Sequence, residues 1–322
     1  MDAIATYHKT LGHPDRLRIL ALLSQGELTV SELVQILGLS QPRITQYIKS
    51  LEEVGIVERM KEGSWVFSRL KRGSDPKSSI LTATLACLPG DDNQLKIDLV
   101  RLEEVRAERS RQAEAFFASV ANDQDQLGHE YLPQADIEAA LLTLVAGLKF
   151  SRMVDLGTGT GRMLKLFAPH INSGVGVDDS VEMLRVARHT LSDDGYAHIS
   201  VQQADLQDAP LKDGAADLVT LHQVLHFLDD SEHALTEAAR LLGVGGHLLI
   251  TDFSAHDLEH YRDDYAHRHL GFGEPEMTQM LEQAGFELVQ LKTLPACDPN
   301  TPAVKIWHAR KSLTAPSRQD KS

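Results

Sequence analysis

The stretch that decides the fold is Val154-Asp155-Leu156-Gly157-Thr158-Gly159-Thr160-Gly161, an apolar segment that runs into a glycine-rich turn. The hydrophobic pattern predicts a strand over residues 152–156 and a helix after the turn. The glycines allow a tight turn and let the backbone approach a ligand closely. An acidic residue precedes them, in the spacing D-x-G-x-G-x-G. Asp155 would repel a pyrophosphate but can hold the ammonium of an amino acid, directly or through water.

Two further carboxylates stand at the ends of the next two predicted strands. Asp178 closes the strand over residues 174–178, and Asp205 follows the strand over residues 198–203. Asp178 can accept hydrogen bonds from both hydroxyls of a ribose, and Asp205 can accept one from the amino group of an adenine. Three carboxylates in a row favour an uncharged adenosine joined to an amino acid over the alternative, a phosphate or nicotinamide site.

The surrounding residues alternate between strand and helix patterns. The predicted strands are 152–156, 174–178, 198–203, 217–221, 247–252, 286–294 and 303–310, and predicted helices between them include 181–191, 233–242 and 276–284. Such alternation predicts an α/β fold, in which a parallel sheet is covered by helices on both faces.

The N-terminal part has a different pattern. Thr29-Val30-Ser31-Glu32 is a capping box that opens a helix ending at Gly38, and Ser40 is placed to cap a second helix over residues 40–54. A basic hairpin over residues 56–70 follows, which predicts a winged helix-turn-helix. The second helix would bury Ile44, Tyr47, Ile48 and Leu51 and expose Gln41, Arg43, Thr45, Gln46 and Lys49.

The exposed residues of the second helix are suited to DNA. Arg43 can pair with a guanine edge and Gln46 with an adenine edge. Lys49, Arg59, Lys61 and Arg69 are expected to contact phosphates. The whole chain has a net charge of −14, but residues 1–75 hold 10 lysines and arginines against 9 acidic residues. The acidic excess therefore lies in the second part.

Four segments are expected: a DNA-binding domain over residues 1–75, a helical connector over 76–135, a ligand-binding domain over 136–311 and a disordered tail over 312–322. The connector contains one long predicted helix, over residues 94–120, which is either a solvated spacer or a dimerisation helix. Cys87 and Cys297, the two cysteines, indicate neither a disulfide framework nor a zinc site. No signal peptide or membrane span is recognisable. We therefore expect a cytoplasmic protein with no metal site and no membrane partner.

Residues 3–70 closely resemble the ArsR-type winged-helix repressors. The resemblance rests on the stretches His13–Leu20, Glu27–Leu33, Leu39–Pro42 and Gly55–Val57. It implies a homodimer on a palindromic, double-stranded DNA operator. Metal-sensing members of that family carry two thiols in the stretch Leu28–Ser31. Thr29 and Ser31 replace them here, and because soft metals need thiolates, a different effector is implied.

Residues 136–310 resemble the class I S-adenosylmethionine-dependent methyltransferases, which have a seven-stranded Rossmann-like sheet. The resemblance implies S-adenosylmethionine as the cofactor. The residues expected to bind it are Asp155, Gly157, Thr158, Gly159, Gly161, Asp178, Asp179, Met183, Asp205, Leu206 and His222, although Met183 suits plain core packing equally well.

The chain as a whole resembles bacterial ArsR–methyltransferase fusions. Such fusions usually have an aromatic entry segment where this chain reads Phe116-Phe117, and this chain departs from that pattern. They also have a His- and Arg-rich stretch comparable to residues 252–272, which we interpret as an acceptor pocket, a lid or a solvated helical face. His222 and His256 are the candidate catalytic bases, and His226 suits packing. We expect a regulator that also methylates a small molecule. The alternative is a non-catalytic sensor of S-adenosylmethionine or S-adenosylhomocysteine.

Overall fold

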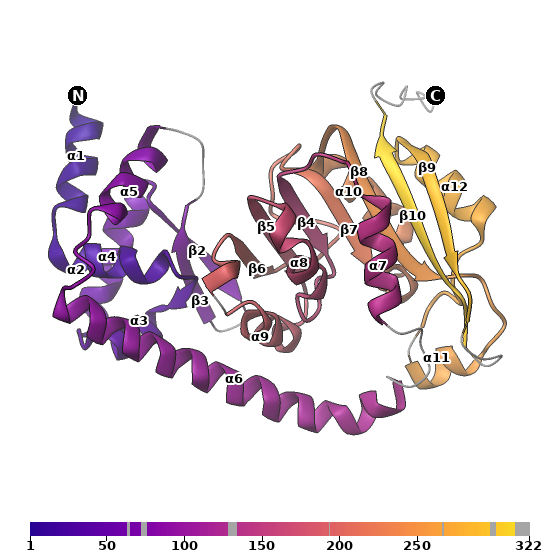
Figure 1. The fold of residues 1–322 in the computed structure, drawn as a ribbon, viewed down its shortest axis with the longest axis horizontal. Helices are drawn as coiled ribbons and strands as arrows, with labels where there is room; N and C mark the ends of the chain where they lie inside the picture. Colours follow the sequence, from indigo (N-terminus) through magenta and orange to yellow (C-terminus); the bar gives the residue numbers. More distant parts are fainter. Residues whose placement is uncertain are drawn as a thin grey trace. The chain divides into compact units, whose positions relative to one another are not determined.

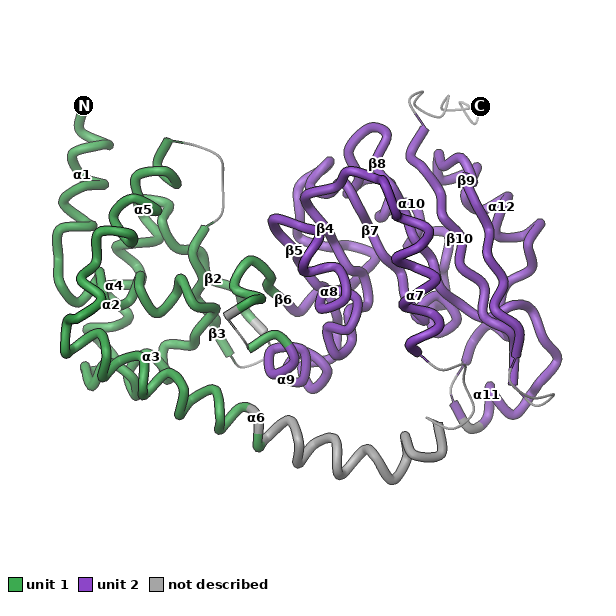
Figure 2. The backbone as a smooth tube through the Cα atoms, viewed as in Figure 1, with its two compact units in different colours: residues 1–114, 191–200 green, residues 115–190, 201–322 purple. Residues whose placement is uncertain are grey.

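The structure, a computed structural model, describes residues 1–62, 65–71, 76–127, 134–192, 194–265, 267–296 and 301–312. Within these ranges, the side chains of residues 62, 110, 112–127, 194 and 264 are outside the description. The chain forms two compact units (Figure 2). One comprises residues 1–114 and 191–200, and the other comprises residues 115–190 and 201–322.

The first unit is built mainly from helices (Figure 1). Its elements are α1 (Asp2–Leu11), α2 (Pro14–Leu23), β1 (Leu28–Thr29), α3 (Val30–Leu37), α4 (Gln41–Glu53), β2 (Val57–Glu62), β3 (Trp65–Leu70), α5 (Pro76–Ala86) and the first part of α6 (Asn93–Leu127). The strands form a small antiparallel sheet in the order β1-β3-β2. This is the predicted helix-turn-helix followed by a hairpin.

Local signals in the sequence explain the helix ends of this unit. Thr29 accepts a hydrogen bond from the backbone N–H of Glu32, and Glu32 accepts one from the N–H of Thr29, which completes the predicted capping box. Gly38 ends α3 at φ 67°, a left-handed conformation that favours glycine. Ser40 is the N-cap residue of α4, as predicted, but its side chain makes no capping hydrogen bond with the described residues. Pro42 instead lies in the first turn of α4, where a missing N–H costs nothing.

The first part of α6 is attached to the helix-turn-helix by charged side chains. Asp98 pairs with Arg18 of α2, and Arg109 pairs with Glu32 of α3. Arg101 and Arg106 donate to the backbone carbonyls of Ile36 and Gln25, respectively. Residues 76–114, which the sequence assigned to a connector, therefore fall within the first compact unit.

The second unit contains a seven-stranded sheet. Its elements are α7 (Gln134–Leu144), β4 (Arg152–Leu156), α8 (Arg162–Phe167), β5 (Ser173–Asp178), α9 (Val181–Thr190), β6 (Ile199–Gln203), β7 (Ala216–His222), α10 (Ser231–Leu241), β8 (Leu242–Phe253), α11 (His260–Tyr265), α12 (Glu274–Gln283), β9 (Phe286–Leu294) and β10 (Val304–Lys311), with short 3-10 turns at Ala168–His170 and Leu225–Phe227. A further 3-10 turn, Asp194–Tyr196, and the first two residues of β6 fall within the first unit. All seven predicted strands are present.

The sheet has the strand order β6-β5-β4-β7-β8-β10-β9. β4 pairs in parallel with β5 and β7, and β7 pairs in parallel with β8, whereas β10 is antiparallel to both of its neighbours. Helices α8 and α9 pack on β4 and β5, α10 packs on β7 and β8, and α12 packs on β9. The parallel strands bring the ends of β4, β5 and β7 to one edge, where ligands bind in such sheets.

Two elements differ from the sequence-based prediction by more than two residues. β8 begins at Leu242 rather than at residue 247, because α10 runs directly into the strand, and α6 ends at Leu127 rather than at residue 120. None of the described helices is long and apolar enough to cross a membrane. The predicted tail lies outside the described residues from position 313 onward.

Candidate DNA-binding and ligand-binding sites

Helix α4 has one buried face and one exposed face. Its buried residues are Ile44, Tyr47, Ile48 and Leu51, as predicted. The five side chains predicted to read DNA from this helix are all exposed: Gln41, Arg43, Thr45, Gln46 and Lys49. The helix therefore presents a continuous row of donors and acceptors, which is what entry into a major groove requires.

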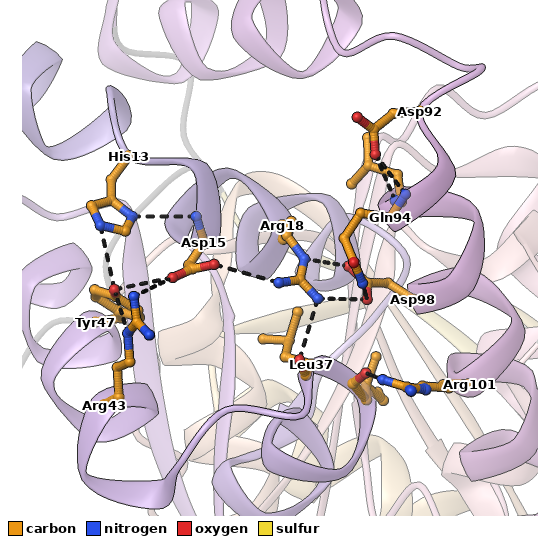
Figure 3. Close-up of polar contacts among 12 residues, drawn as sticks. His13, Asp15, Arg18, Leu37, Arg43, Tyr47, Asp92, Gln94, Asp98 and Arg101 are labelled. Atoms are coloured by element: carbon orange, nitrogen blue, oxygen red, sulfur yellow. Dashed lines mark hydrogen bonds and ion pairs between the residues drawn. The ribbon is translucent and has the colours of Figure 1, made fainter.

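Arg43 is the exposed residue of α4 with the most defined surroundings (Figure 3). Its Nε donates to the hydroxyl of Tyr47 at 2.9 Å, and its Nη2 lies 2.9 Å from Oδ2 of Asp15. The Tyr47 hydroxyl lies 3.2 Å from the same Asp15 oxygen and 3.3 Å from Nε2 of His13. Asp15 also contacts Arg18, which is bound to Asp98.

The basic residues of the hairpin differ from one another in their contacts. Arg59 pairs with Glu52 at 2.7 Å, and Arg69 pairs with Glu58 at 2.6 Å. Lys61 is exposed on β2. A phosphate contact by Arg59 would compete with its ion pair to Glu52. The phosphate contact of Lys61 stays a prediction. The predicted turn at residues 63–64 lies outside the described residues.

In the second unit, a cavity of about 590 Å³ lies at the edge where the parallel strands end. Of the residues predicted to bind the cofactor, all but Gly161 line it. The lining residues that the sequence analysis did not single out are Gln134, Thr160, Arg162, Met163, Gln223, Val224, Phe227 and Leu228. Gly161 instead precedes α8 at φ 79°, so its observed role is to start that helix.

The glycine turn forms one wall of this cavity. Gly157 has φ 71°, and its N–H donates to the carbonyl of Val177 at 2.8 Å. A Cβ atom at Gly157 would lie 2.5 Å from Cγ2 of Val224, which is closer than packed atoms approach. The turn therefore needs glycine there both for its backbone conformation and for the close approach of Val224.

Asp178 is held by the glycine turn and by the chain that follows it. Its Oδ2 accepts from the N–H of Gly159 at 2.7 Å, and its Oδ1 accepts from the N–H of Ser180 at 3.0 Å. Burial raises its pKa above the ordinary value of a carboxyl, against the effect of these hydrogen bonds. Asp205 is exposed at the far side of the cavity and accepts from the N–H of Gln207 at 2.8 Å.

Asp155 lies deeper than the other two carboxylates. It is 1% exposed, and its two oxygens accept hydrogen bonds from the hydroxyls of Thr158 and Thr220. Burial raises the pKa of Asp155 to about 6, although these hydroxyls oppose the shift. Through Thr158, Asp155 holds the glycine turn. Each of its oxygens accepts one hydrogen bond and keeps a further lone pair, so Asp155, which lines the cavity, can still accept from an ammonium group.

Three buried polar atoms that line the cavity have no hydrogen-bond partner among the described residues: Nδ1 of His222, Oε1 of Gln134 and Nε2 of Gln223. Burial lowers the pKa of His222 to about 4, so its ring is neutral at pH 7. The other amide atoms of the two glutamines face each other, with Nε2 of Gln134 3.4 Å from Oε1 of Gln223. Gln223 has φ 52° and is the one non-glycine residue with positive φ in the described chain. Backbone strain of this kind concentrates at functional sites.

His256, the second candidate base, does not line the cavity. It lies in a cluster of rings with Phe253 and Tyr261, and its Nδ1 accepts from the N–H of Leu258. The same cluster contains His226, whose Nδ1 lies 2.7 Å from Oδ1 of the fully buried Asp252. His226 is thus a packed, hydrogen-bonded core residue. Its neighbour Phe227, with ring centroids 4.1 Å apart, separates it from the cavity.

Comparisons with known proteins agree with the two-part architecture. Residues 13–59 match the model of the bacterial regulatory protein, arsR family, and residues 154–250 match that of a methyltransferase domain. The chain is 36% identical over 91 residues to the biofilm growth-associated repressor of Agrobacterium fabrum, covering 28% of this chain and 76% of the repressor. This chain belongs to the arsR family of bacterial regulatory proteins.

The second unit of this arsR-family protein carries a methyltransferase domain. The chain is 31% identical over 104 residues to the uncharacterized methyltransferase YcgJ of Bacillus subtilis, which covers 32% of this chain and 41% of YcgJ. It thus spans about two fifths of the length of that relative. The crystal structure of the [4+2]-cyclase SpnF aligns with a TM-score of 0.50 at 16% identity, covering 62% of this chain and 94% of SpnF. That likeness confirms the Rossmann-like fold alone.

Sequence reasoning missed the polar residues at the strained end of the cavity in this arsR-family regulator. Gln223 directly follows His222, but a left-handed glutamine has no sequence signature. Gln134 begins α7, 89 positions before its partner. Arg162 was detectable in principle, because it opens the helix after the glycine turn; it pairs with Glu138 at 2.7 Å.

Proposed function

We propose that this protein is a DNA-binding transcriptional regulator whose second unit binds S-adenosylmethionine and transfers its methyl group to a small molecule. The observation that carries the proposal is the cavity at the carboxyl ends of the parallel strands. Asp178 and Asp205 line it, and so does Gln223, which has a positive φ and whose buried Nε2 has no partner among the described residues. We propose the cytoplasm, where DNA and this cofactor are both found, as the place of action.

The lining residues suit an adenosyl amino acid. The cavity volume falls within the range of small-molecule and cofactor sites, roughly 300–1,000 Å³. Asp178 and Asp205 would hold the ribose and the adenine, and Met183 and Leu206 offer apolar contacts to the base. Asp155, which also lines the cavity, would hold the ammonium end, directly or through water.

When bound, S-adenosylmethionine supplies a methyl group on a sulfonium that is already a good leaving group. The protein's contribution is therefore alignment and exclusion of water, and alignment alone is worth roughly 7–11 kcal/mol. Val224, Phe227 and Leu228 line the cavity with apolar surface that excludes water. Burial lowers the pKa of His222 to about 4, so its ring is neutral at pH 7 but weakly basic. With its proton on Nε2, its buried Nδ1 can accept a hydrogen bond from an O–H, N–H or S–H acceptor and take the proton as it becomes acidic on methylation.

The acceptor would bind beside Gln134 and Gln223. The side-chain amides of Gln134 and Gln223 share one hydrogen bond, which leaves one NH2 donor and one oxygen acceptor for a ligand. This holds even if the oxygen and nitrogen of both amides are exchanged. Buried groups of this kind favour a ligand that supplies the matching pair and disfavour one that does not. His256 would act on an acceptor only if the ring cluster in front of it opened.

Two measurements test this proposal on the purified chain. Calorimetry with S-adenosylmethionine and with S-adenosylhomocysteine should show binding at one site per chain. Absence of heat from both compounds, together with no shift in melting temperature, would refute cofactor binding. A panel of thiol, phenol and amine acceptors, assayed for S-adenosylhomocysteine release, then tests transfer.

A second candidate function is sensing of the cofactor or its demethylated product without turnover. Helix α6 favours it, because this single 35-residue helix starts in the first unit, where Asp98 and Arg109 anchor it, and ends in the second. Ligand binding can control DNA only if it favours one state of the regulator over another. Operator affinity that is the same with and without each ligand would remove this candidate.

We also propose that the protein binds a palindromic operator as a homodimer. Two recognition helices about 34 Å apart would then meet successive major grooves. Helix α6 supports dimerisation, because it exposes the apolar side chains of Ile97, Leu99 and Val100. Val100→Asp should shift the sedimentation coefficient from dimer to monomer, whereas Glu103→Gln on the same helix should not. A monomeric wild type would exclude the dimer.

A further inference from the structure

Arg43 of α4 is held in one orientation before any DNA is present. A guanidinium has five N–H groups arranged in two edges, one formed by Nε and Nη2 and the other by Nη1 and Nη2. The first edge is occupied here: Nε donates to Tyr47, and Nη2 pairs with Asp15 (Figure 3). The second edge is left for another partner, and the side chain is 51% exposed.

The hydroxyl of Tyr47 is fully engaged in this arrangement. Nδ1 of His13 accepts the backbone N–H of Asp15 at 3.2 Å, so the neutral ring carries its proton on Nε2 and donates to Tyr47. The hydroxyl thus accepts from His13 and Arg43 and donates to Oδ2 of Asp15. Because Tyr47 is 9% exposed and packs in the core, it cannot turn away from Arg43 easily.

Asp15 is itself fixed by a chain of alternating charges. Its Oδ1 lies 3.4 Å from Nη1 of Arg18. Arg18 donates from Nε and Nη2 to the two oxygens of Asp98 at 2.6 and 2.8 Å, and Asp98 on α6 is 1% exposed. The series Arg43–Asp15–Arg18–Asp98 therefore links the recognition helix to α6 through contacts made entirely within the first unit.

We propose that Asp15 and Tyr47 are positioning residues that hold Arg43 ready to read a guanine, with Asp98 as their anchor through Arg18. This inference rests on the proposed role of α4 in reading DNA. The open edge of Arg43 offers two parallel N–H groups, which match O6 and N7 of guanine. A long side chain already held in place loses less freedom on binding, which favours the correct base over others.

The arrangement predicts a signature that a purely structural role would not give. Asp15 places a negative charge beside the DNA-binding face, and this charge opposes binding to any phosphate backbone. Asp15→Asn should therefore raise affinity for unrelated DNA while it lowers discrimination between sequences. Damage to the fold would lower both.

The probe is a duplex selected from a random pool by the full-length wild-type protein, with 7-deazaguanine then placed at each guanine in turn to remove N7. At one guanine, wild type should lose about tenfold in affinity, within the range for one bidentate contact. In Asp15→Asn and Tyr47→Phe this penalty should fall below threefold, and in Asp98→Asn to an intermediate value. Glu53→Gln, which removes an exposed carboxylate from the same helix, should keep the full penalty.

The outcomes distinguish the base-reading role of Arg43 from the positioning role of Asp15 and Tyr47. If Arg43→Ala keeps the tenfold penalty, Arg43 reads no guanine, and the base-reading role proposed for it fails together with this inference. If Arg43→Ala loses the penalty while Asp15→Asn and Tyr47→Phe keep it, only the positioning role is overturned. As a readout without DNA, the Nε–H of Arg43 should exchange with solvent several times more slowly in wild type than in Tyr47→Phe. Equal rates would also overturn the positioning role.

Discussion

The attachment of α6 in the first unit and the cavity of the second unit differ in how their polar groups are satisfied. The side chains that attach α6 to the helix-turn-helix are paired: Asp98 binds Arg18, and Glu32 binds Arg109. In the cavity, Nδ1 of His222, Oε1 of Gln134 and Nε2 of Gln223 are buried and have no hydrogen-bond partner among the described residues. Unpartnered buried groups cost free energy, of the order of 1–3 kcal/mol each.

The difference indicates what satisfies the polar groups of each site. The DNA-reading surface is ordered by the chain's own contacts, so its side chains are already in place before DNA binds. The cavity keeps unsatisfied donors, acceptors and a strained backbone, all of which a ligand can relieve. The following experiments test this contrast, beginning with the largest expected effect.

Asp98→Ala should destabilise the first unit by about 3 kcal/mol, because removing one partner leaves the Arg18 charge partly buried without its main carboxylate. Hydrogen exchange of α2 and α3 should accelerate accordingly, whereas exchange in β4 and β7 should not change. Glu104→Gln, at an exposed position on the same helix, is the control. Protection equal to that of the control would show that this contact does not stabilise the unit.

Asp178→Ala should weaken binding of S-adenosylmethionine at least a hundredfold, since it removes both the proposed ribose contact and the support of Gly159 and Ser180. Calorimetry measures the change. Asp208→Asn, an exposed position outside the cavity, should bind as wild type does. Affinity retained in Asp178→Ala would mean that the ribose is not held by this residue.

Lowering the pH from 7 to 5 should strengthen the second unit through Asp155. Burial raises the folded pKa of Asp155 to about 6, above its ordinary value of 3.8, so the folded state takes up a proton that the unfolded state does not. The stabilising contribution therefore grows as the pH falls through 6, by about 1 kcal/mol between pH 7 and 5. Thermal unfolding at several pH values, compared with Asp155→Asn, isolates this contribution; parallel curves for the two proteins would contradict it.

Gln223→Gly should melt at a higher temperature than Gln223→Ala, by an amount corresponding to about 1 kcal/mol. Both variants lose the side chain, but only glycine adopts φ 52° without strain. Calorimetric unfolding of the two variants gives the difference directly. Equal stability would show that the backbone at this position stores no strain.

The sequence predicted the features that depend on local pattern. The seven strands, the buried stripe of α4 and the capping box at Thr29 follow from hydrophobic spacing and turn chemistry, and the structure confirms them. The three carboxylates could be placed near one sheet edge because parallel strands end together. Their partners could not be inferred: nothing in the sequence indicates that both oxygens of Asp155 are engaged by hydroxyls.

Features that join distant parts of the chain were not predictable. Arg18 and Asp98 are 80 positions apart, and Gln134 and Gln223 are 89 apart. Contacts of this kind depend on how elements pack, and hydrophobic periodicity does not encode such packing. The same limit applies to α6. The sequence left a solvated spacer and a dimerisation helix equally open, and it did not indicate that charged residues of this helix bind other parts of the first unit.

The capping box at the start of α3 has a further consequence. Glu32, which caps the helix with Thr29, is also bound by Arg109 of α6 at 2.7 Å. Burial raises the Glu32 pKa, but Arg109 and the hydrogen bonds from Thr29 together outweigh burial and lower that pKa. One carboxylate thus joins the start of α3 to α6. A substitution at Thr29 that removes the hydroxyl would therefore disturb both the helix start and the attachment of α6.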